Sequence, residues 1–149
     1  MQRMRLKPPH VALLMLGLAG LLHVMLPLPL WCSSGLPVWG AISLLPGLVL
    51  MIWAWKLFWQ SGTTIQPDGQ ASFLVTTGPY RITRNPMYLG ITLVLTGVAC
   101  AVGSITMLVA PLGFYLCMNL LFIPGEEQRL EQIFGDLYHS YTSRTRRWL

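Results

Sequence analysis

Charged residues are scarce in this chain of 149 residues: only 10% are Asp, Glu, Lys or Arg, whereas 54% are hydrophobic. The mean hydropathy of +0.56 lies well outside the usual range for a soluble domain. A chain of this length and composition has room for one compact helical bundle with short connections, which excludes a separate soluble catalytic domain. We therefore expect an integral membrane protein whose chemistry takes place in or at the membrane.

Pairs of cysteines at metal-binding spacing are also lacking. Cys32, Cys100 and Cys117 form no C-x-x-C pair, and the last two lie inside apolar runs, where they are expected to be small hydrophobic residues. Neither a disulfide framework nor a metal site is indicated. The net charge of +5 does not indicate nucleic acid, because the ten basic residues are scattered among apolar segments, where they report topology and anionic lipid headgroups.

Long apolar runs, by contrast, fill most of the chain. We expect four transmembrane helices at about 11–30, 38–59, 86–102 and 105–123. The first run is longer than the apolar core of a signal peptide, so we expect a retained helix. In the second, Trp39 and Trp59 mark the two membrane interfaces. The last two are halves of one apolar run, joined near Gly103-Ser104.

Two polar segments complete the chain, a connection at 60–85 and a C-terminal segment at 126–141 whose apolar residues recur at helical spacing on one face. Pro124-Gly125 is expected to break the helix before it, and the tail "SRTRRWL" to form a basic anchor at the membrane interface. The predicted fold class is all-α, a single domain (1–149) that is an integral membrane bundle of about four transmembrane helices plus a C-terminal amphipathic interfacial helix.

Charge is distributed unevenly along this expected bundle. All Lys and Arg residues fall on one side of it, and the two turns on the other side contain none. The positive-inside rule therefore predicts a multi-pass protein with both termini in the cytoplasm. The five acidic residues fall on the same side, so any polar active site is expected at the cytoplasmic face.

A cationic turn, "TTGPYRITRNPMYLG", leads into the third apolar segment. Asn85 is a favourable N-cap and Pro86 a natural first helical residue. The free N–H groups of this helix end, together with Arg81 and Arg84 just upstream, predict an anion site. A basic pair that only anchors the helix to lipid headgroups is the alternative, and for such a pair alone it is the better interpretation.

The second motif, "PGEEQRLEQIFGDLYHSY", places Glu126 and Glu127 in the first turn of the C-terminal helix, flanking its apolar stripe. We expect both carboxylates to face the bundle close to the bilayer surface, although compensation of the helix dipole explains them as well. An anion-binding turn opposite two carboxylates suits a zwitterionic ligand. S-adenosylmethionine has that pattern, and so does a phospholipid headgroup.

Together the two motifs, the second with the tail "TSRTRRWL" that follows it, resemble those of the isoprenylcysteine carboxyl methyltransferase and phospholipid methyltransferase group of integral membrane enzymes. The likeness is to its small bacterial members in particular, which implies the bacterial inner membrane. The resemblance covers roughly Gln60 to Leu149. Matching residues are Arg81, Arg84, Pro86, Tyr88 and Gly90 in the first motif and Glu126, Glu127, Leu130, Phe134, Gly135, Tyr138 and Tyr141 in the second. Many members have His at the position of Asn85. Asparagine cannot titrate, so a general acid–base role does not carry over from the family to this position.

The resemblance implies an S-adenosylmethionine-dependent methyltransferase with a pocket between the turn and the C-terminal helix. The cofactor-binding residues that it implies are Gly78, Pro79, Tyr80, Arg84, Asn85, Pro86, Tyr88, Gly90, Glu126 and Glu127. The expected catalytic residues are Arg81, which would orient the cofactor or acceptor, and Glu127 or Tyr88, which would deprotonate an amine or thiol. The expected partner is a lipophilic acceptor within the membrane lipids: an isoprenoid or prenyl-cysteine-like carboxylate or thiol, or an aminophospholipid.

Three other functions stay open. A small transporter subunit would need an ionisable residue or polar track within its spans. A non-catalytic scaffold or lipid-binding protein predicts the same fold, and a nicotinamide-dependent lipid reductase would need a dinucleotide site, for which no glycine-rich phosphate loop is present. Within the spans, His23 is expected near mid-bilayer as a neutral histidine bonded to a neighbouring helix. Asn119 could line the pocket or join two helices.

Overall fold

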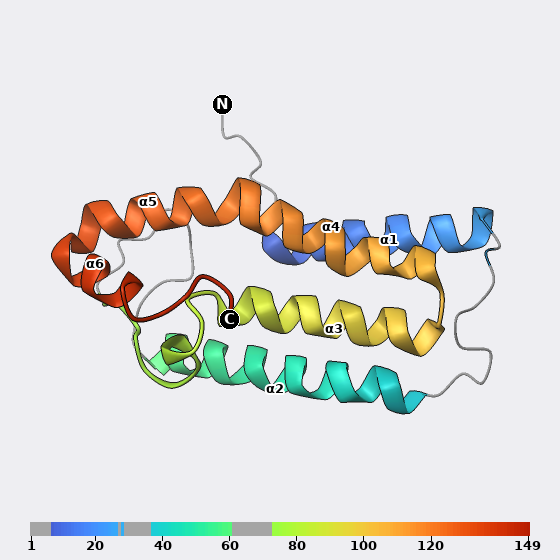
Figure 1. The fold of residues 1–149 in the computed structure, drawn as a ribbon, viewed down its shortest axis with the longest axis horizontal. Helices are drawn as coiled ribbons and strands as arrows, with labels where there is room; N and C mark the ends of the chain where they lie inside the picture. The colour runs from blue at the N-terminus through green and yellow to red at the C-terminus, as the bar shows by residue number, and fades with distance from the viewer. Residues whose placement is uncertain (1–6, 27, 29–36, 61–72) are drawn as a thin grey trace.

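The computed structural model describes residues 7–26, 28, 37–60 and 73–149, and over these ranges the chain is helical with no strand beyond one isolated bridge (Figure 1). Its α-helices are α1 (Pro8–Met25), α2 (Pro37–Gln60), α3 (Pro86–Val102), α4 (Val109–Cys117), α5 (Ile123–Phe134) and α6 (Asp136–Thr142). Short 3₁₀ helices cover Gly78–Arg81 and Ile105–Leu108, and a π-helical turn covers Met118–Phe122. The all-α fold class is confirmed, whereas Cys32 and most of the polar connection, 61–72, lie outside the described residues.

Three helical segments are long and apolar enough to cross a membrane: Pro8–Met25, Val38–Gln60 and Ile105–Phe134. Helix α3 is apolar too but shorter, with 17 residues. These segments fit an integral membrane protein. Helix α1 ends at Met25, earlier than the expected end near residue 30.

The helix that begins at Ile105 continues without interruption to Phe134, so the expected break at Pro124-Gly125 is wrong. Pro124 lies in the first turn of α5, directly after the π-helical turn. Proline lacks a backbone N–H, and in a regular α-helix its ring collides with the carbonyl four residues earlier. The preceding π turn widens the helix and makes room for the ring, because its hydrogen bonds reach five residues back, as from the Ile123 N–H to the Met118 carbonyl.

Gly135 ends this long helix instead, and the expected single helix at 126–141 is therefore two. Its φ of +49° and ψ of −121° fall in a region that residues with a Cβ rarely adopt. The backbone changes direction there, and α6 leads the chain back towards the start of α3, where the C-terminus lies (Figure 1). Gly135 thus determines where the last residues are placed.

Substituting Gly135 with alanine is expected to lower the free energy of unfolding by about 1–3 kcal/mol, because the backbone would be strained. A Cβ at Gly135 would have no atom within 4 Å, so no steric contact contributes. The matched control is Gly125→Ala, which also has open space around the new Cβ but regular helical geometry. That control should be neutral or slightly stabilising. Thermal unfolding in detergent compares the stabilities of the two variants. Equal effects would show that Gly135→Ala does not strain the backbone.

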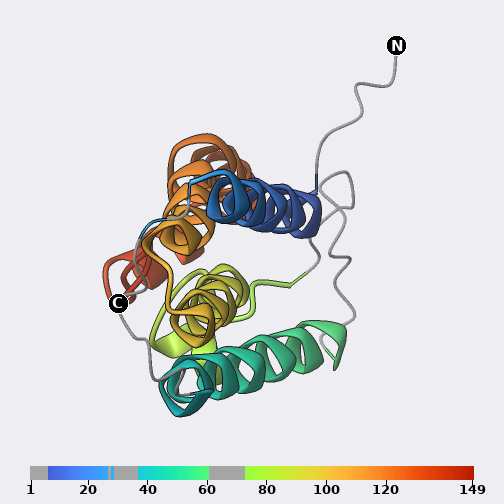
Figure 2. The same ribbon diagram turned by 90° about the vertical axis from the view of Figure 1, so that its right-hand side faces the viewer.

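The helices pack as two pairs, α2 with α3 and α1 with α4, and α3 also contacts α4 (Figure 2). Glycines make the first pair unusually close. A Cβ at Gly97 would lie 2.6 Å from Leu44 Cβ and 2.7 Å from the Gly40 carbonyl oxygen, and one at Gly90 would lie 2.8 Å from the Gly47 oxygen. Small residues that let backbones approach are a main source of helix association in membranes.

His23 lies in the last turn of α1, so its expected place near mid-bilayer is wrong. Its Nδ1 is 2.9 Å from the hydroxyl of Ser104, which lies in the turn after α3 and not in the neighbouring helix expected for its partner. Ser104 is fully buried and also contacts the Thr106 hydroxyl at 2.8 Å. The connection between α3 and α4, which contains Ser104 and Thr106, lies at the end of the bundle opposite α6 (Figure 1).

Candidate functional site

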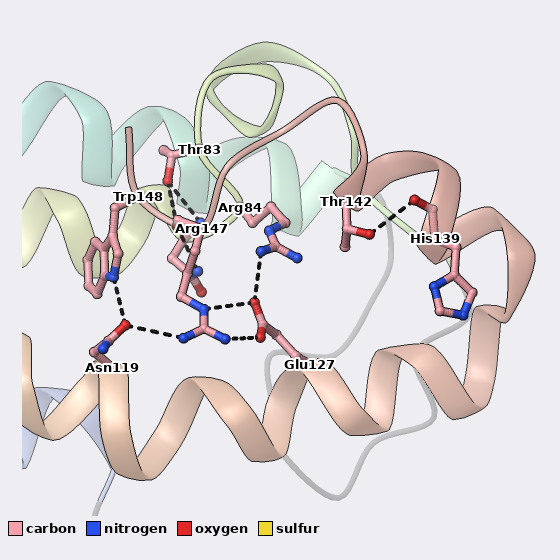
Figure 3. Close-up of polar contacts among 9 residues, drawn as sticks. Thr83, Arg84, Asn119, Glu127, His139, Thr142, Arg147 and Trp148 are labelled. Atoms are coloured by element: carbon pink, nitrogen blue, oxygen red, sulfur yellow. Dashed lines mark hydrogen bonds and ion pairs between the residues drawn. The ribbon is translucent and has the colours of Figure 1, made fainter.

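The C-terminal segment returns to the turn that precedes α3 and pairs with it. Thr83 and Arg146 form a parallel bridge, and the Arg84 N–H donates to the Arg146 carbonyl at 2.9 Å. The Thr83 hydroxyl and the Asn85 side-chain amide both donate to the Arg147 carbonyl, each at 3.0 Å. Residues more than sixty positions apart in the sequence therefore form one site (Figure 3).

Asn85 occupies the N-cap position of α3, but its side chain makes no capping hydrogen bond, so the expected capping is wrong. The side-chain amide is oriented towards the C-terminal segment instead. Its backbone N–H donates to the Thr83 hydroxyl at 3.2 Å, and Pro86 follows as the buried first residue of the helix. The turn is thus stabilised by the returning chain.

Glu127 stands between two arginines at the centre of the site. Arg147 donates through Nε to Glu127 Oε1 at 3.1 Å and through Nη2 to Oε2, and Arg84 Nη2 lies 3.3 Å from Oε1 (Figure 3). The side chains are 18% (Arg84), 20% (Glu127) and 35% (Arg147) exposed. The hydrogen bond to Glu127 raises the pKa of Arg147, which stays charged. Two guanidinium groups and one carboxylate leave a net charge of +1.

One donor of this cluster has no partner within the described part of the chain: the Nε of Arg84, which is buried. Buried polar groups in folded proteins are nearly always hydrogen-bonded, and an unmade bond to a charged group is costly. An unpaired N–H in a cluster with net positive charge favours an anionic ligand group. This is the feature of the site that most directly indicates a ligand.

Asn119 connects the returning segment to the long helix. Its Oδ1 accepts from Trp148 Nε1 at 3.0 Å and from Arg147 Nη1 at 3.4 Å. The Trp148 ring packs on Tyr115, with ring centroids 4.7 Å apart. Arg147 and Trp148, which the sequence interpretation assigned to a membrane anchor, thus contact the protein's own helices. Asn119 lies in the π-helical turn, an element found frequently at functional sites.

Tyr88 and Glu126 form a second polar pair beside this cluster. The Tyr88 hydroxyl donates to Glu126 Oε1 at 2.6 Å, and the Tyr88 ring meets Phe114 edge-on. Because Glu126 is exposed and this is its one hydrogen bond among the described residues, its remaining lone pairs can accept from a ligand. The first of the two glutamates is available to a ligand, whereas the second is bound by arginines.

The other residues expected at the site serve the turn itself. Gly78 has a φ of +60°, and a Cβ there would lie 2.5 Å from Leu57 of α2; Pro79 and Tyr80 are buried next to it. The Tyr141 hydroxyl donates to the Tyr80 carbonyl at 2.7 Å, and burial raises the pKa of both phenols, so they stay protonated. These residues fix the turn against α2 and α6.

Of the expected site residues, the structure brings together Arg84, Asn85, Tyr88, Glu126 and Glu127. The Arg81 side chain is exposed and has no hydrogen bond or ion pair among the described residues, and Gly90 packs against α2 instead of joining the cluster. The sequence interpretation missed Arg147 and Trp148. The available signal was a basic, tryptophan-containing tail directly after the second motif.

Residues 36–137 match the family model described as "Phospholipid methyltransferase". The chain belongs to the phospholipid methyltransferase family. The expected resemblance is thereby confirmed, and membership of the phospholipid methyltransferase family supports methyltransferase activity at a membrane in general terms. A Haemophilus influenzae protein described as "Uncharacterized protein" is 36% identical over 63 residues, 42% of this chain and 100% of that protein. No solved structure matches the chain.

Proposed function

We propose that this protein is an S-adenosylmethionine-dependent methyltransferase acting on a lipophilic acceptor at the membrane surface. The observation that carries the proposal is the Arg84–Glu127–Arg147 cluster with its unpaired Arg84 N–H. It lies where the two family motifs meet, in a chain of the phospholipid methyltransferase family. A cationic cluster next to an accessible carboxylate suits a ligand with both an anionic and a cationic end.

The residues that would hold the cofactor follow from their charges. Arg84 would bind its carboxylate, because the cluster that it forms with Glu127 and Arg147 has a net charge of +1 and the Arg84 Nε has no partner among the described residues. Glu126 would accept from its amino or ribose hydroxyl groups. Glu127 already accepts two hydrogen bonds from Arg147 and forms an ion pair with Arg84, so we assign it to holding the two arginines in place and no longer to the cofactor or to proton transfer.

When bound, S-adenosylmethionine supplies an electrophilic methyl group on a sulfonium. The protein's own contribution is to align this group with the acceptor and to exclude water. A carboxylate acceptor needs no base. An amine or thiol must lose a proton, and Glu126, hydrogen-bonded to Tyr88, is the carboxylate available to take it. Tyr88 then orients Glu126 and donates to it.

The acceptor is proposed to be lipophilic because the site lies at one end of a bundle whose apolar helices fit a membrane. An isoprenoid or prenyl-cysteine-like carboxylate or thiol, or an aminophospholipid, meets this condition. Nothing in the described residues favours a transporter subunit, a scaffold or a nicotinamide-dependent reductase. We further propose that the site and both termini face the cytoplasm of a bacterial inner membrane, since Arg84, Arg146 and Arg147 lie at the site and the sequence pattern places the other basic residues on the same side.

Calorimetry of S-adenosylmethionine binding to the purified protein in lipid nanodiscs tests the proposal. We expect saturable binding by the wild type and a dissociation constant raised roughly tenfold or more by Arg84→Ala, which removes charge-assisted hydrogen bonds. Arg144→Ala is the control, since Arg144 is exposed and its side chain makes no hydrogen bond or ion pair with the cluster among the described residues. Absence of binding by folded wild-type protein would refute the cofactor assignment.

A further inference from the structure

The segment Thr145–Trp148 follows the two motifs in the sequence, yet it contributes side chains and backbone groups to the site. We propose that this segment, here named the C-terminal clasp, is a built-in part of the cofactor site, and that Arg147 is a positioning residue that fixes Glu127 and, through it, Arg84. The inference rests on the proposed function. It assigns a role to a residue that neither motif contains.

The clasp is held on both sides of Arg147. Before it, Arg146 is bridged to Thr83 and accepts from the Arg84 N–H, and Thr145 is buried. After it, the Trp148 indole donates to Asn119. The Arg147 carbonyl itself accepts from two side chains of the turn. The backbone that carries the Arg147 side chain is therefore fixed, which limits the conformations that its guanidinium group can adopt next to Glu127.

Arg147 contacts the Glu127 carboxylate at two points. Its Nε and Nη2 reach the two different carboxylate oxygens, a geometry that a planar guanidinium matches and that fixes the plane of the carboxylate. Of the two carboxylate oxygens, Arg84 then meets only Oε1, through its Nη2, and its Nε stays unpaired among the described residues. The contact with Arg147 thus determines how much of Arg84 is left for a ligand.

Loss of the Arg147 side chain would change this division. Glu127 would be free to turn towards Arg84 and pair with it at two points, which would occupy the N–H groups otherwise available to a ligand. The cluster's net charge would fall from +1 to zero. Both effects weaken the binding of an anionic group, although the remaining Arg84–Glu127 pair still satisfies the buried charges. Arg147→Ala is therefore expected to impair binding more than folding.

Calorimetry separates these two effects, because it reports the affinity and the fraction of competent protein independently. With full-length Arg147→Ala we expect the dissociation constant for S-adenosylmethionine to rise about tenfold or more, with the binding stoichiometry unchanged. Arg147→Lys should recover only part of the affinity, because an ammonium group cannot make the two parallel bonds. Arg144→Ala, which removes the same charge from an exposed position three residues earlier, should bind as the wild type does.

Three other results are decisive. If the wild type binds and Arg147→Ala binds equally well, or loses stoichiometry at constant affinity, the positioning role is overturned and the proposed function stands. If Arg147→Lys binds as the wild type does, charge alone matters and the two-point contact is overturned. If folded wild type does not bind, the proposed function fails and the role of the clasp in it fails as well.

A readout without cofactor tests the clasp itself. The bonds after Arg146 and Arg147 lie in backbone that is paired with the turn, so trypsin should trim the wild-type tail slowly. Asn119→Ala removes the acceptor for Trp148 and should accelerate trimming several-fold, as followed by the mass of the intact protein. Equal rates in the two proteins would overturn the clasp.

Discussion

Glu127→Gln is expected to lower the free energy of unfolding by about 3 kcal/mol. Removing one partner of a shielded ion pair leaves the other uncompensated, and here two guanidinium groups would face each other with no carboxylate between them. An amide of the same shape also brings an NH₂ group to a position where the carboxylate accepts. The midpoint of thermal unfolding in mixed micelles, followed by circular dichroism, measures the loss.

The matched control lies one helical turn further along α5. Glu131 pairs with His139 at 3.2 Å, but these side chains are 51% and 61% exposed. Exposed ion pairs contribute about 0–1 kcal/mol, so Glu131→Gln should leave the midpoint nearly unchanged. Similar midpoints for Glu127→Gln and Glu131→Gln would show that the negative charge of Glu127 is not needed to hold the two arginines in place.

Gly97→Ala is expected to lower the free energy of unfolding by about 1–3 kcal/mol, although a single methyl group is added. The new Cβ would lie 2.6 Å from Leu44 Cβ and 2.7 Å from both the Gly40 oxygen and the Leu44 nitrogen. Backbone atoms cannot move aside as a flexible side chain does, so α2 and α3 must separate. The higher helix propensity of alanine offsets roughly 1 kcal/mol at most.

Gly20→Ala in α1 is the control, since a Cβ there has open space around it. It should be neutral or stabilising in the same unfolding assay. Gly40→Ala should resemble Gly97→Ala, because a Cβ at Gly40 would lie 2.7 Å from the Gly97 oxygen. The double variant should lose less stability than the sum of the two single losses, since one separation of the helices accommodates both methyl groups. Strict additivity would contradict a shared contact.

Local sequence rules predicted the parts of the fold that depend on neighbouring residues. The observed range of α3, Pro86–Val102, coincides with the expected 86–102, because Asn85-Pro86 and Gly103 bound an apolar run. The same rules failed at Pro124, because a proline breaks only a helix of regular hydrogen bonding and the preceding π turn is not visible in the pattern. They placed His23 too deep because the end of α1 was set too late.

Part of the candidate site could likewise be predicted from the sequence, and part could not. Arg84 and the two glutamates lie in short motifs, and charge and helical spacing suffice to select them. Arg147 and Trp148 reach the site only because the chain bends at Gly135 and α6 leads it back, and the direction of that bend is a property of the assembled structure. Membrane proteins also offer a competing interpretation for every basic tail that contains tryptophan.

The sharing of one carboxylate by two arginines has an evolutionary consequence. A substitution of Glu127 alone leaves two cations facing each other, and a substitution of either arginine alone alters how the other one is held. None of the three positions can change neutrally by itself, so each constrains which mutations the other two tolerate. Arg84, Glu127 and Arg147, drawn from a turn, a helix and the C-terminal clasp, should therefore be inherited as a single unit or replaced together.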